Sequence, residues 1–408
     1  MSCFTLYRIP YTLYHKPKHK IRNTKYNPMR IENIRMESSP GLVRAVATVK
    51  WETCQEPDKD IYIETEAAFA ESFSCNPHAF VVGCLIPAMH FKEERLKIEA
   101  DICPYLREGL DLVMALMHLW SNGAYTPLKI EAGTASMDPF QRTQRQAGLF
   151  LSGGFDSLAA LRLNRLTYPD SHPGSIKDCF LVHGFDIGGV VARGMKYHVF
   201  DRAKAALADV AEDAGVNLIP VYTNIRHLCD ERDLWLDKFF GAVLAAVAHT
   251  FVPRSNLVYI GSSYDLPNIH PCGSHPLLDP EFSSYNLKIR HRDLHLSRVE
   301  KLKIVADWDV AFQNFRVCLA NVKDRLNCGK CEKCVRTMAG LVAIDKLHQT
   351  RAFVEDDLDP DLLSSFNIRI RVREPFYEEL IPLLEKRGRN DLVDTLNRML
   401  GKHEKNLK

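Results

Sequence analysis

Two short stretches of the chain carry side chains whose types and spacing could do chemistry. Residues 152–157 have the sequence Ser-Gly-Gly-Phe-Asp-Ser and follow a short apolar run. Two adjacent glycines let a backbone fold closely around an anion, because no Cβ is in the way. A helix that starts directly after such a turn offers free N–H groups to a phosphate. The stretch therefore predicts a nucleotide phosphate loop, with contacts from Leu151, Ser152, Gly153, Gly154, Phe155, Asp156 and Ser157.

Three polar side chains of this loop are the candidate catalytic residues. The hydroxyls of Ser152 and Ser157 could donate to phosphate oxygens, and Asp156 could position a magnesium ion or hold the turn. The loop differs from the Walker A pattern in its spacing and in its missing lysine. Composition alone leaves a second interpretation open, a glycine turn that merely connects a strand to a helix.

The second stretch is a cluster of four cysteines. Three closely spaced thiols and one slightly upstream can close a tetrahedral zinc site. Gly329 permits a tight turn between two of them, and a helix that starts near Glu332 would point its positive dipole end at the thiolates. The expected ligands are Cys318, Cys328, Cys331 and Cys334.

An iron–sulfur cluster is the competing interpretation of these cysteines. The ferredoxin pattern places its next cysteine after three more residues, where this chain has Met338. Zinc is therefore favoured. Because cysteine would fill all four positions, the zinc would have no open site for water and would be structural. The neighbouring Lys333 and Arg336 could screen the negative charge of the thiolates, but a position on the solvated surface is favoured.

Composition indicates a protein of two or three domains without a membrane span. Of the 408 residues, 46% are hydrophobic and 25% charged, as in ordinary soluble proteins. The net charge of +2 gives no general attraction to nucleic acid or membranes. The longest apolar run, 234–251, contains charged residues and fits a buried helix. No secretory signal is evident, so we expect a cytoplasmic protein with free or metal-bound thiols.

The N-terminal third is expected to form a tail and one domain. Residues 1–40 are basic and expected to be a disordered tail, with a basic arm that contacts RNA as the alternative. Residues 41–132 predict an α+β domain with a role in substrate recognition, partner binding or dimerisation. Its expected strands are 42–51, 61–65, 79–86, 96–102 and 128–131, and its helix is 106–120.

Beyond a polar linker at 133–146, strands and helices alternate. This order predicts an α/β fold, a doubly wound parallel sheet with helices on both faces and ligands at the carboxyl ends of the strands. The expected strands are 148–151, 179–183, 217–221 and 257–260, and the helices are 157–165, 197–214 and 234–251. The segment 262–292 lacks clear periodicity, and its Asp265, His270, His275 and Asp279 could be pocket groups or an ordinary polar loop.

Three further features close the chain. Ser297 and Glu300 form a capping box that starts a helix, and the cysteine cluster follows. Residues 346–408 predict a C-terminal helical extension, with two short amphipathic helices at 375–387 and 390–400. For these helices only a packing role is expected.

Loop 152–157 resembles the Ser-Gly-Gly-x-Asp-Ser signature of the PP-loop ATP pyrophosphatase superfamily. Its members cleave ATP between the α and β phosphates and adenylate a substrate oxygen. Together with the cysteine cluster downstream, residues 147–345 resemble the 7-cyano-7-deazaguanine synthase branch of that superfamily. The resemblance implies an adenine nucleotide alpha hydrolase-like domain with ATP, Mg²⁺ and a four-cysteine Zn²⁺ site.

The resemblance also implies contacts outside the loop. In the family, adenine lies near the ends of the first and second strands, which points to His183 and Gly184 here. Gly261 and Ser262, after the last parallel strand, are further candidate contacts. His183 could equally be a histidine that packs at a strand end.

The implied activity is that of an ATP-dependent ligase that forms carbon–nitrogen bonds, as in queuosine-type 7-deazaguanine biosynthesis. A substrate carboxylate would be adenylated with release of pyrophosphate, and ammonia or an amine would then displace AMP. In the family the substrate is 7-carboxy-7-deazaguanine, and the product is an amide and then a nitrile. A second copy of the chain is left open as a partner.

Two departures leave the acceptor open. The second strand ends in His183-Gly-Phe instead of the family's Tyr-Gly-Gln, and residues 262–279 replace the segment expected to line the acceptor pocket. The alternatives are conjugation of a deazaguanine-type acid to a protein amine, modification or thiolation of a tRNA base, and a non-catalytic ATP-binding scaffold. Thiolation would need a reactive cysteine such as Cys272.

Overall fold

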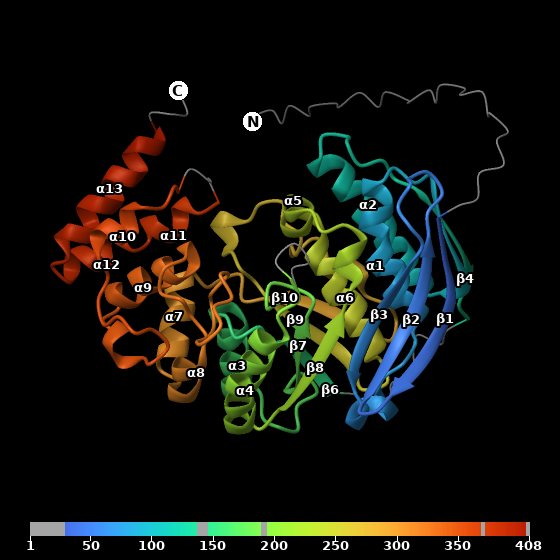
Figure 1. The fold of residues 1–408 in the computed structure, drawn as a ribbon, viewed down its shortest axis with the longest axis horizontal. Coiled ribbons are helices and arrows are strands. Elements are labelled where there is room, and N and C mark those ends of the chain that lie inside the picture. The colour runs from blue at the N-terminus through green and yellow to red at the C-terminus, as the bar shows by residue number, and fades with distance from the viewer. Residues whose placement is uncertain (1–28, 137–145, 189–193, 369–371, 405–408) are drawn as a thin grey trace, which may run out of the picture.

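The structure is a computed structural model that describes residues 29–136, 146–188, 194–368 and 372–404. One sheet of ten strands runs through it, in the order β10-β9-β6-β7-β8-β3-β2-β1-β4-β5 (Figure 1). The strands are β1 (Met29–Ser39), β2 (Leu42–Lys50), β3 (Lys59–Glu66), β4 (Arg95–Ile102), β5 (Lys129–Thr134), β6 (Gln146–Phe150), β7 (Ile176–His183), β8 (Asn217–Thr223), β9 (Ser255–Gly261) and β10 (Lys288–Arg292).

Helices connect and cover these strands. The longer ones are α1 (Pro77–His90), α2 (Pro104–Trp120), α3 (Phe155–Thr167), α4 (Tyr197–Ala214), α6 (Phe240–Thr250), α7 (Arg298–Ala306), α9 (Glu332–Ala343) and α13 (Asn390–Glu404). The shorter ones are α5 (Arg232–Leu234), α8 (Asp309–Asn314), α10 (Pro360–Ser364), α11 (Glu374–Glu378) and α12 (Ile381–Lys386). A π-helical turn, η4 (Trp235–Phe239), joins α5 to α6, and the 3-10 turn η3 (Ile225–Leu228) follows β8.

Five adjacent strands of the sheet are parallel. β6 lies in the middle, with β7 and then β8 on one side and β9 and then β10 on the other. Along the chain, β7 and β8 are therefore added on one side of β6 first, and β9 and β10 are then added on the other side. Ligands of such sheets bind beyond the carboxyl ends of the strands, where the order reverses. The parallel α/β sheet predicted from the alternation is confirmed, and the loop of interest follows β6.

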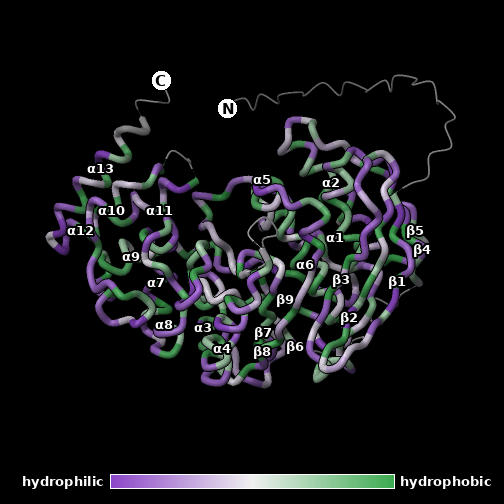
Figure 2. Tube along the Cα trace, in the orientation of Figure 1, coloured by the Kyte–Doolittle hydropathy of each residue, from purple (hydrophilic) through white to green (hydrophobic). Residues whose placement is uncertain are grey.

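The two faces of the sheet bury two separate cores. Successive strand residues point to opposite faces, so Leu149 packs with α3 and α4 while Phe150 packs with α1 and α6. Figure 2 shows hydrophobic residues gathered along the central strands and α6. Helices thus cover both faces of the parallel part (Figure 1).

One predicted strand, 79–86, is wrong, because this segment lies within helix α1. Every residue from His78 to Met89 is buried. Because the segment has no polar face, its sequence does not show the 3.6-residue period of a helix. The helix start is nonetheless marked. The Asn76 side chain accepts a hydrogen bond from the His78 N–H, and Pro77 occupies the first turn.

The predicted N-terminal tail is wrong for its last residues. β1 covers Met29–Ser39 and pairs with β2 and β4, with Met29 and Ile31 fully buried. Its alternating pattern is obscured by an irregular register between Glu32 and Arg35. Residues 1–28, and residues 137–145 of the predicted linker, lie outside the described residues. Strands of the region 41–132 continue the same sheet, because β3 pairs with β8.

Two predictions about the C-terminal half have clear outcomes. The capping box is confirmed, since Ser297 Oγ accepts from Glu300 N and the Glu300 carboxylate accepts from Ser297 N. The segment 262–292 contains a strand that periodicity did not reveal, β10, which pairs with β9. Among the described residues, no helix is both long enough and apolar enough to cross a membrane.

Two buried histidines between α1 and α6 make the fold sensitive to acid. His78 Nε2 accepts from Cys103 N at 2.9 Å, so its protonation would break that bond. Burial lowers the pKa of His78 to about 4 and that of His249, whose ring packs against it, to about 3. Both folded pKa values lie below the unfolded value of 6.5, so stability is intact above pH 6.5 and is lost as the pH falls toward 4.

We therefore expect His78→Gln to flatten the pH dependence of stability. Between pH 7 and pH 5 the wild type should lose about 2 kcal/mol more free energy of unfolding than the variant does. Urea unfolding at both pH values measures this difference. His348→Gln, on the exposed surface, should keep the wild-type slope. Equal slopes in wild type and His78→Gln would contradict the expectation.

Candidate phosphate loop and metal centre

The predicted phosphate loop connects the carboxyl end of β6 to the start of α3. Gly153 has φ +77°, a conformation that favours glycine. Gly154 is the N-cap residue of α3, and no side chain caps the helix there. The first N–H groups of a helix have no acceptor within the helix, so they remain available to an anion. The prediction that the loop opens a helix is confirmed.

The two serine hydroxyls have different surroundings. Ser157 is buried, and its Oγ donates to the Gly154 carbonyl at 3.0 Å and accepts from Ser152 N at 3.2 Å. The Ser152 hydroxyl lies 3.4 Å from that of Ser157, and Ser152 itself is exposed. Ser157 therefore holds the turn from inside, while the Ser152 hydroxyl is the one open to a ligand.

Two cations from α7 lie against Asp156. Arg298 and Lys301 place nitrogens 3.5 and 3.6 Å from its Oδ1, which accepts no hydrogen bond in the described part of the chain. Lys301 is 1% exposed, and its Nζ donates to the Ser262 carbonyl at 2.5 Å. A buried ammonium is costly unless it is compensated. One carboxylate therefore faces two cations directly beside the loop.

Further positive charge borders the loop from the cysteine segment. Arg316 N donates to the Gly153 carbonyl at 2.8 Å, and its buried side chain bonds Asn321. Burial lowers the pKa of Arg316 and of the half-buried Lys333; Cys318 and then Asp186 oppose this effect at Arg316, and Asp186 opposes it at Lys333. The groups that oppose the loss of charge at Arg316 therefore include the cysteine cluster as well as a carboxylate.

The position of Arg336 contradicts the expectation that this residue lies on the solvated surface. It is only 8% exposed, it pairs with Glu332 at 3.5 Å, and its guanidinium lies 4.6 Å from the Phe376 ring centroid. Arg298 approaches the same ring at 5.7 Å. Tyr264 stacks on Phe376 as well, and burial raises the pKa of Tyr264 to about 12. Phe376 of α11 therefore packs against Arg298, which in turn faces Asp156 of the loop.

His183 ends β7 inside an aromatic cluster. It is 1% exposed, its ring stacks on Tyr197 at 4.6 Å, and Phe200 and Tyr222 pack around it. Burial lowers its pKa to about 4, so the ring is neutral near pH 7. This position fits a packed strand-end histidine, and its contact with adenine stays a prediction.

Gly184 lies where the chain passes the end of β8. Its φ is +107°, and a Cβ there would lie 2.1 Å from the Thr223 carbonyl oxygen. We expect Gly184→Ala to cost about 3 kcal/mol or more, since backbone strain and a clash combine. Gly215→Ala is the matched control, because it has φ +63° with open space around it, and should cost about 1 kcal/mol. Urea unfolding distinguishes them, and equal costs would contradict the steric argument.

Gly261 and Ser262 end β9 beside the loop. A Cβ on Gly261 would lie 2.8 Å from the Asp156 carbonyl oxygen, so glycine permits the close approach of β9 to α3. Ser262 is buried, its N–H donates to Arg292 and its hydroxyl donates to Tyr264 O at 2.5 Å. Both residues thus shape the site through their backbone.

The polar residues of 262–292 have internal partners. Asp279 is fully buried and accepts from Ser274 Oγ at 2.6 Å and from His291 Nδ1 at 2.7 Å. Asp265 accepts from Asn268 at 2.5 Å, and His275 Nδ1 accepts from Leu277 N. These contacts favour a structural role for the segment over a magnesium site.

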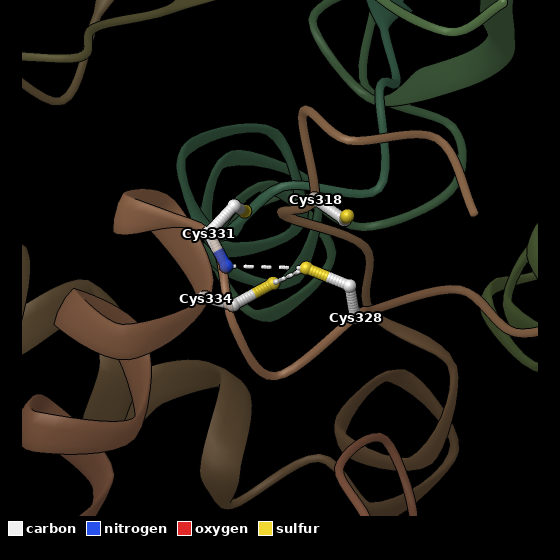
Figure 3. Close-up of side chains that lie close together, drawn as sticks. All are labelled: Cys318, Cys328, Cys331 and Cys334. Atoms are coloured by element: carbon white, nitrogen blue, oxygen red, sulfur yellow. Dashed lines mark hydrogen bonds between the residues drawn. The ribbon is translucent and has the colours of Figure 1, made fainter. Parts of the chain in front are cut away.

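The four predicted cysteines come together. Their sulfurs all lie within 4.8 Å of one another, and those of Cys328 and Cys334 are 3.8 Å apart (Figure 3). Gly329 has φ +68°, as the tight turn requires, and α9 begins at Glu332 with Cys331 as its N-cap. Lys330 N and Cys331 N donate to Cys328 Sγ at 3.4 and 3.2 Å.

This donor set fits a tetrahedral metal ion. Zn–S bonds of about 2.3 Å place the sulfurs of a tetrahedron about 3.8 Å apart, as Cys328 and Cys334 are. Burial raises the pKa of the Cys328 thiol, and hydrogen bonds from the neighbouring thiols lower that of Cys318. A dication would replace the shared protons. The cluster could therefore hold a metal such as zinc.

The metal centre and the loop are joined through one short segment. Arg316, bonded to Gly153, lies two residues before Cys318. Asn327, directly before Cys328, accepts from Val317 N at 2.8 Å and donates to Phe315 O at 3.0 Å. The cysteine cluster thus fixes the segment that supports the phosphate loop.

Sequence reasoning missed Arg298, Lys301, Arg316 and Phe376. Arg298 and Lys301 are three residues apart at the start of α7, which is the spacing of one helix face, and this was the available signal. Nothing local in the sequence marks the other two.

Comparisons with protein-family models, with curated proteins and with solved structures find no match to this chain. The fold and site define an α/β protein with a ten-stranded sheet, largely parallel, and a four-cysteine cluster suited to a metal ion.

Proposed function

We propose that this chain binds ATP at loop 152–157 and uses it to adenylate a substrate carboxylate, which ammonia or an amine then attacks. The observation that carries the proposal is the position of this loop. It lies between the carboxyl end of β6 and the uncapped start of α3, with the buried Lys301 beside its Asp156 and the Arg316 backbone N–H bonded to its Gly153 carbonyl. A polyphosphate would satisfy the free N–H groups and would add negative charge beside Arg298 and Lys301, which share one carboxylate.

We further infer that residues 147–345 form a doubly wound domain of the PP-loop type. The strand order 8-7-6-9-10 and the helices on both faces support this inference. The loop sequence is the second support. A structural zinc in the four-cysteine cluster would then stabilise the segment that contacts Gly153.

In the proposed reaction, a carboxylate oxygen attacks the α-phosphorus and the bond to the β-phosphate oxygen breaks. Pyrophosphate leaves with the bonding electrons, and the loop N–H groups, Ser152 and the cations stabilise its charge. The amine nitrogen then attacks the acyl carbon, loses a proton and displaces AMP. When bound, Mg²⁺ would supply positive charge that neutralises the phosphates, and Asp156 and Asp186 would be the carboxylates that hold it.

The test uses the whole chain with ATP, Mg²⁺ and ammonium, with and without 7-carboxy-7-deazaguanine. We expect AMP and pyrophosphate in equal amounts only when the acid is present. Ser152→Ala should lower the rate about 100-fold, since it removes the exposed loop hydroxyl. Ser39→Ala, an exposed serine at the end of β1, is the control.

The outcomes separate the parts of the proposal. If no acid-dependent AMP forms, 7-carboxy-7-deazaguanine is not the substrate. If Ser152→Ala keeps the full rate, the loop is not the site of phosphate transfer.

A further inference from the structure

A second group of metal-ligating side chains lies apart from the four cysteines. His90 at the end of α1, and Cys229 and Glu231 between η3 and α5, bring an imidazole nitrogen, a thiol and a carboxylate oxygen within 4.8 Å of one another. The two segments are well separated in sequence and meet because α1 packs against η3. Cys229 is buried, His90 is half-buried and Glu231 is exposed.

We propose that His90, Cys229 and Glu231 form a three-ligand site for a divalent transition metal of the zinc class, with a fourth position open to solvent. Thiolate, imidazole and carboxylate are all zinc ligands, and three protein ligands with one open position are typical of reactive zinc sites. Glu231, whose side chain is 64% exposed, faces the open side.

The contacts around His90 support a ligand role for its Nε2. Its Nδ1 lies 2.9 Å from the Tyr125 hydroxyl, while Nε2 lies 3.2 Å from the Glu231 carboxylate. Metal-binding histidines commonly use their second nitrogen for such an orienting hydrogen bond. If the ring is neutral and Nδ1–H donates to the Tyr125 hydroxyl, the lone pair of His90 Nε2 faces the Glu231 carboxylate. A metal cation between Nε2 and the carboxylate oxygen would make this contact favourable.

The contacts around Cys229 also support a metal-ligand role. Both the backbone N–H and the carboxylate of Glu231 lie within hydrogen-bonding reach of the Cys229 sulfur, so the thiol and the carboxylate adjoin directly. Metal binding would displace the thiol proton.

The test is metal binding by the full chain, stripped with chelator and titrated with Co²⁺ or Zn²⁺. We expect Cys229→Ser and His90→Ala each to remove one metal equivalent and its thiolate-to-cobalt absorption. Cys75→Ser, a half-buried thiol elsewhere, should remove none. A Cys328→Ser/Cys331→Ser variant should still bind the equivalent that Cys229→Ser removes, so the two sites are tested separately.

Two conservative variants distinguish a loss of metal binding from a loss of the folded structure. Glu231→Gln changes an exposed side chain, and Tyr125→Phe removes only a hydroxyl; each should weaken the metal affinity about 10- to 100-fold with unchanged circular dichroism. Metal binding that is the same in wild type, Cys229→Ser and His90→Ala would overturn the proposal. In that case the group is a histidine–carboxylate pair beside a buried thiol.

Discussion

Cys331→Ser is expected to abolish metal binding at the four-cysteine cluster and to lower the free energy of unfolding by about 4 kcal/mol. This is the stabilisation that a ligand gives when its free concentration is about 1,000 times its dissociation constant. All four sulfurs already lie within 4.8 Å of one another and one pair is 3.8 Å apart, as in a tetrahedral zinc site, so little rearrangement opposes binding. Metal analysis and urea unfolding with and without zinc measure both effects.

The same variant should weaken ATP binding, because the segment after α8 supports Gly153 through Arg316. Cys272→Ser, outside the cluster, is the control for the loss of one thiol. Unchanged stability and unchanged zinc content in Cys331→Ser would show that the cluster holds no metal. Iron and sulfide in place of zinc would contradict the choice of metal.

Lys301→Met is expected to slow pyrophosphate release about 100-fold or more. Lys301 is buried beside Asp156 and the Ser262 carbonyl, so its charge acts with little screening by water. Lys303→Met, on the exposed side of the same helix, should leave the rate unchanged. Single-turnover measurement of pyrophosphate formation gives the rate of this chemical step.

Loss of Lys301 also leaves Asp156 with Arg298 as its remaining ion-pair partner among the described residues, which is destabilising for a partly buried carboxylate. The double variant Lys301→Met/Asp156→Asn removes that charge and should regain much of the stability but not the activity. A Lys301→Met protein that is folded and fully active would exclude this lysine from the site.

The sequence predicted those parts of the fold whose signals are local. The amphipathic spacing of 197–214 matches α4 residue for residue, and the Ser297 capping box starts α7 as expected. The apolar run 79–86 was assigned to a strand because a segment buried on all sides has no period, although Asn76 and Pro77 marked a helix start. The sequence does not reveal β10 because it has five residues, partly polar, and lies at the edge of the described sheet, next to β9.

The same distinction holds for the candidate site. The loop residues are consecutive and the four cysteines lie close together in sequence, so the spacing within each motif carried the prediction. Lys301 lies in α7, Arg316 between α8 and α9 and Phe376 in α11, and only the folded chain brings them together. Arg336 was expected on the surface, since its cover comes from Phe376, forty residues downstream.

Isotope transfer tests the proposed adenylation most directly. The acid is supplied with ¹⁸O in its carboxylate, together with ATP, Mg²⁺ and ammonium, and the mass of the released AMP is measured. Adenylation predicts that AMP carries one ¹⁸O atom, because the carboxylate oxygen that attacks the α-phosphorus leaves with AMP. Unlabelled AMP, or cleavage of ATP to ADP and phosphate, would contradict the proposed reaction.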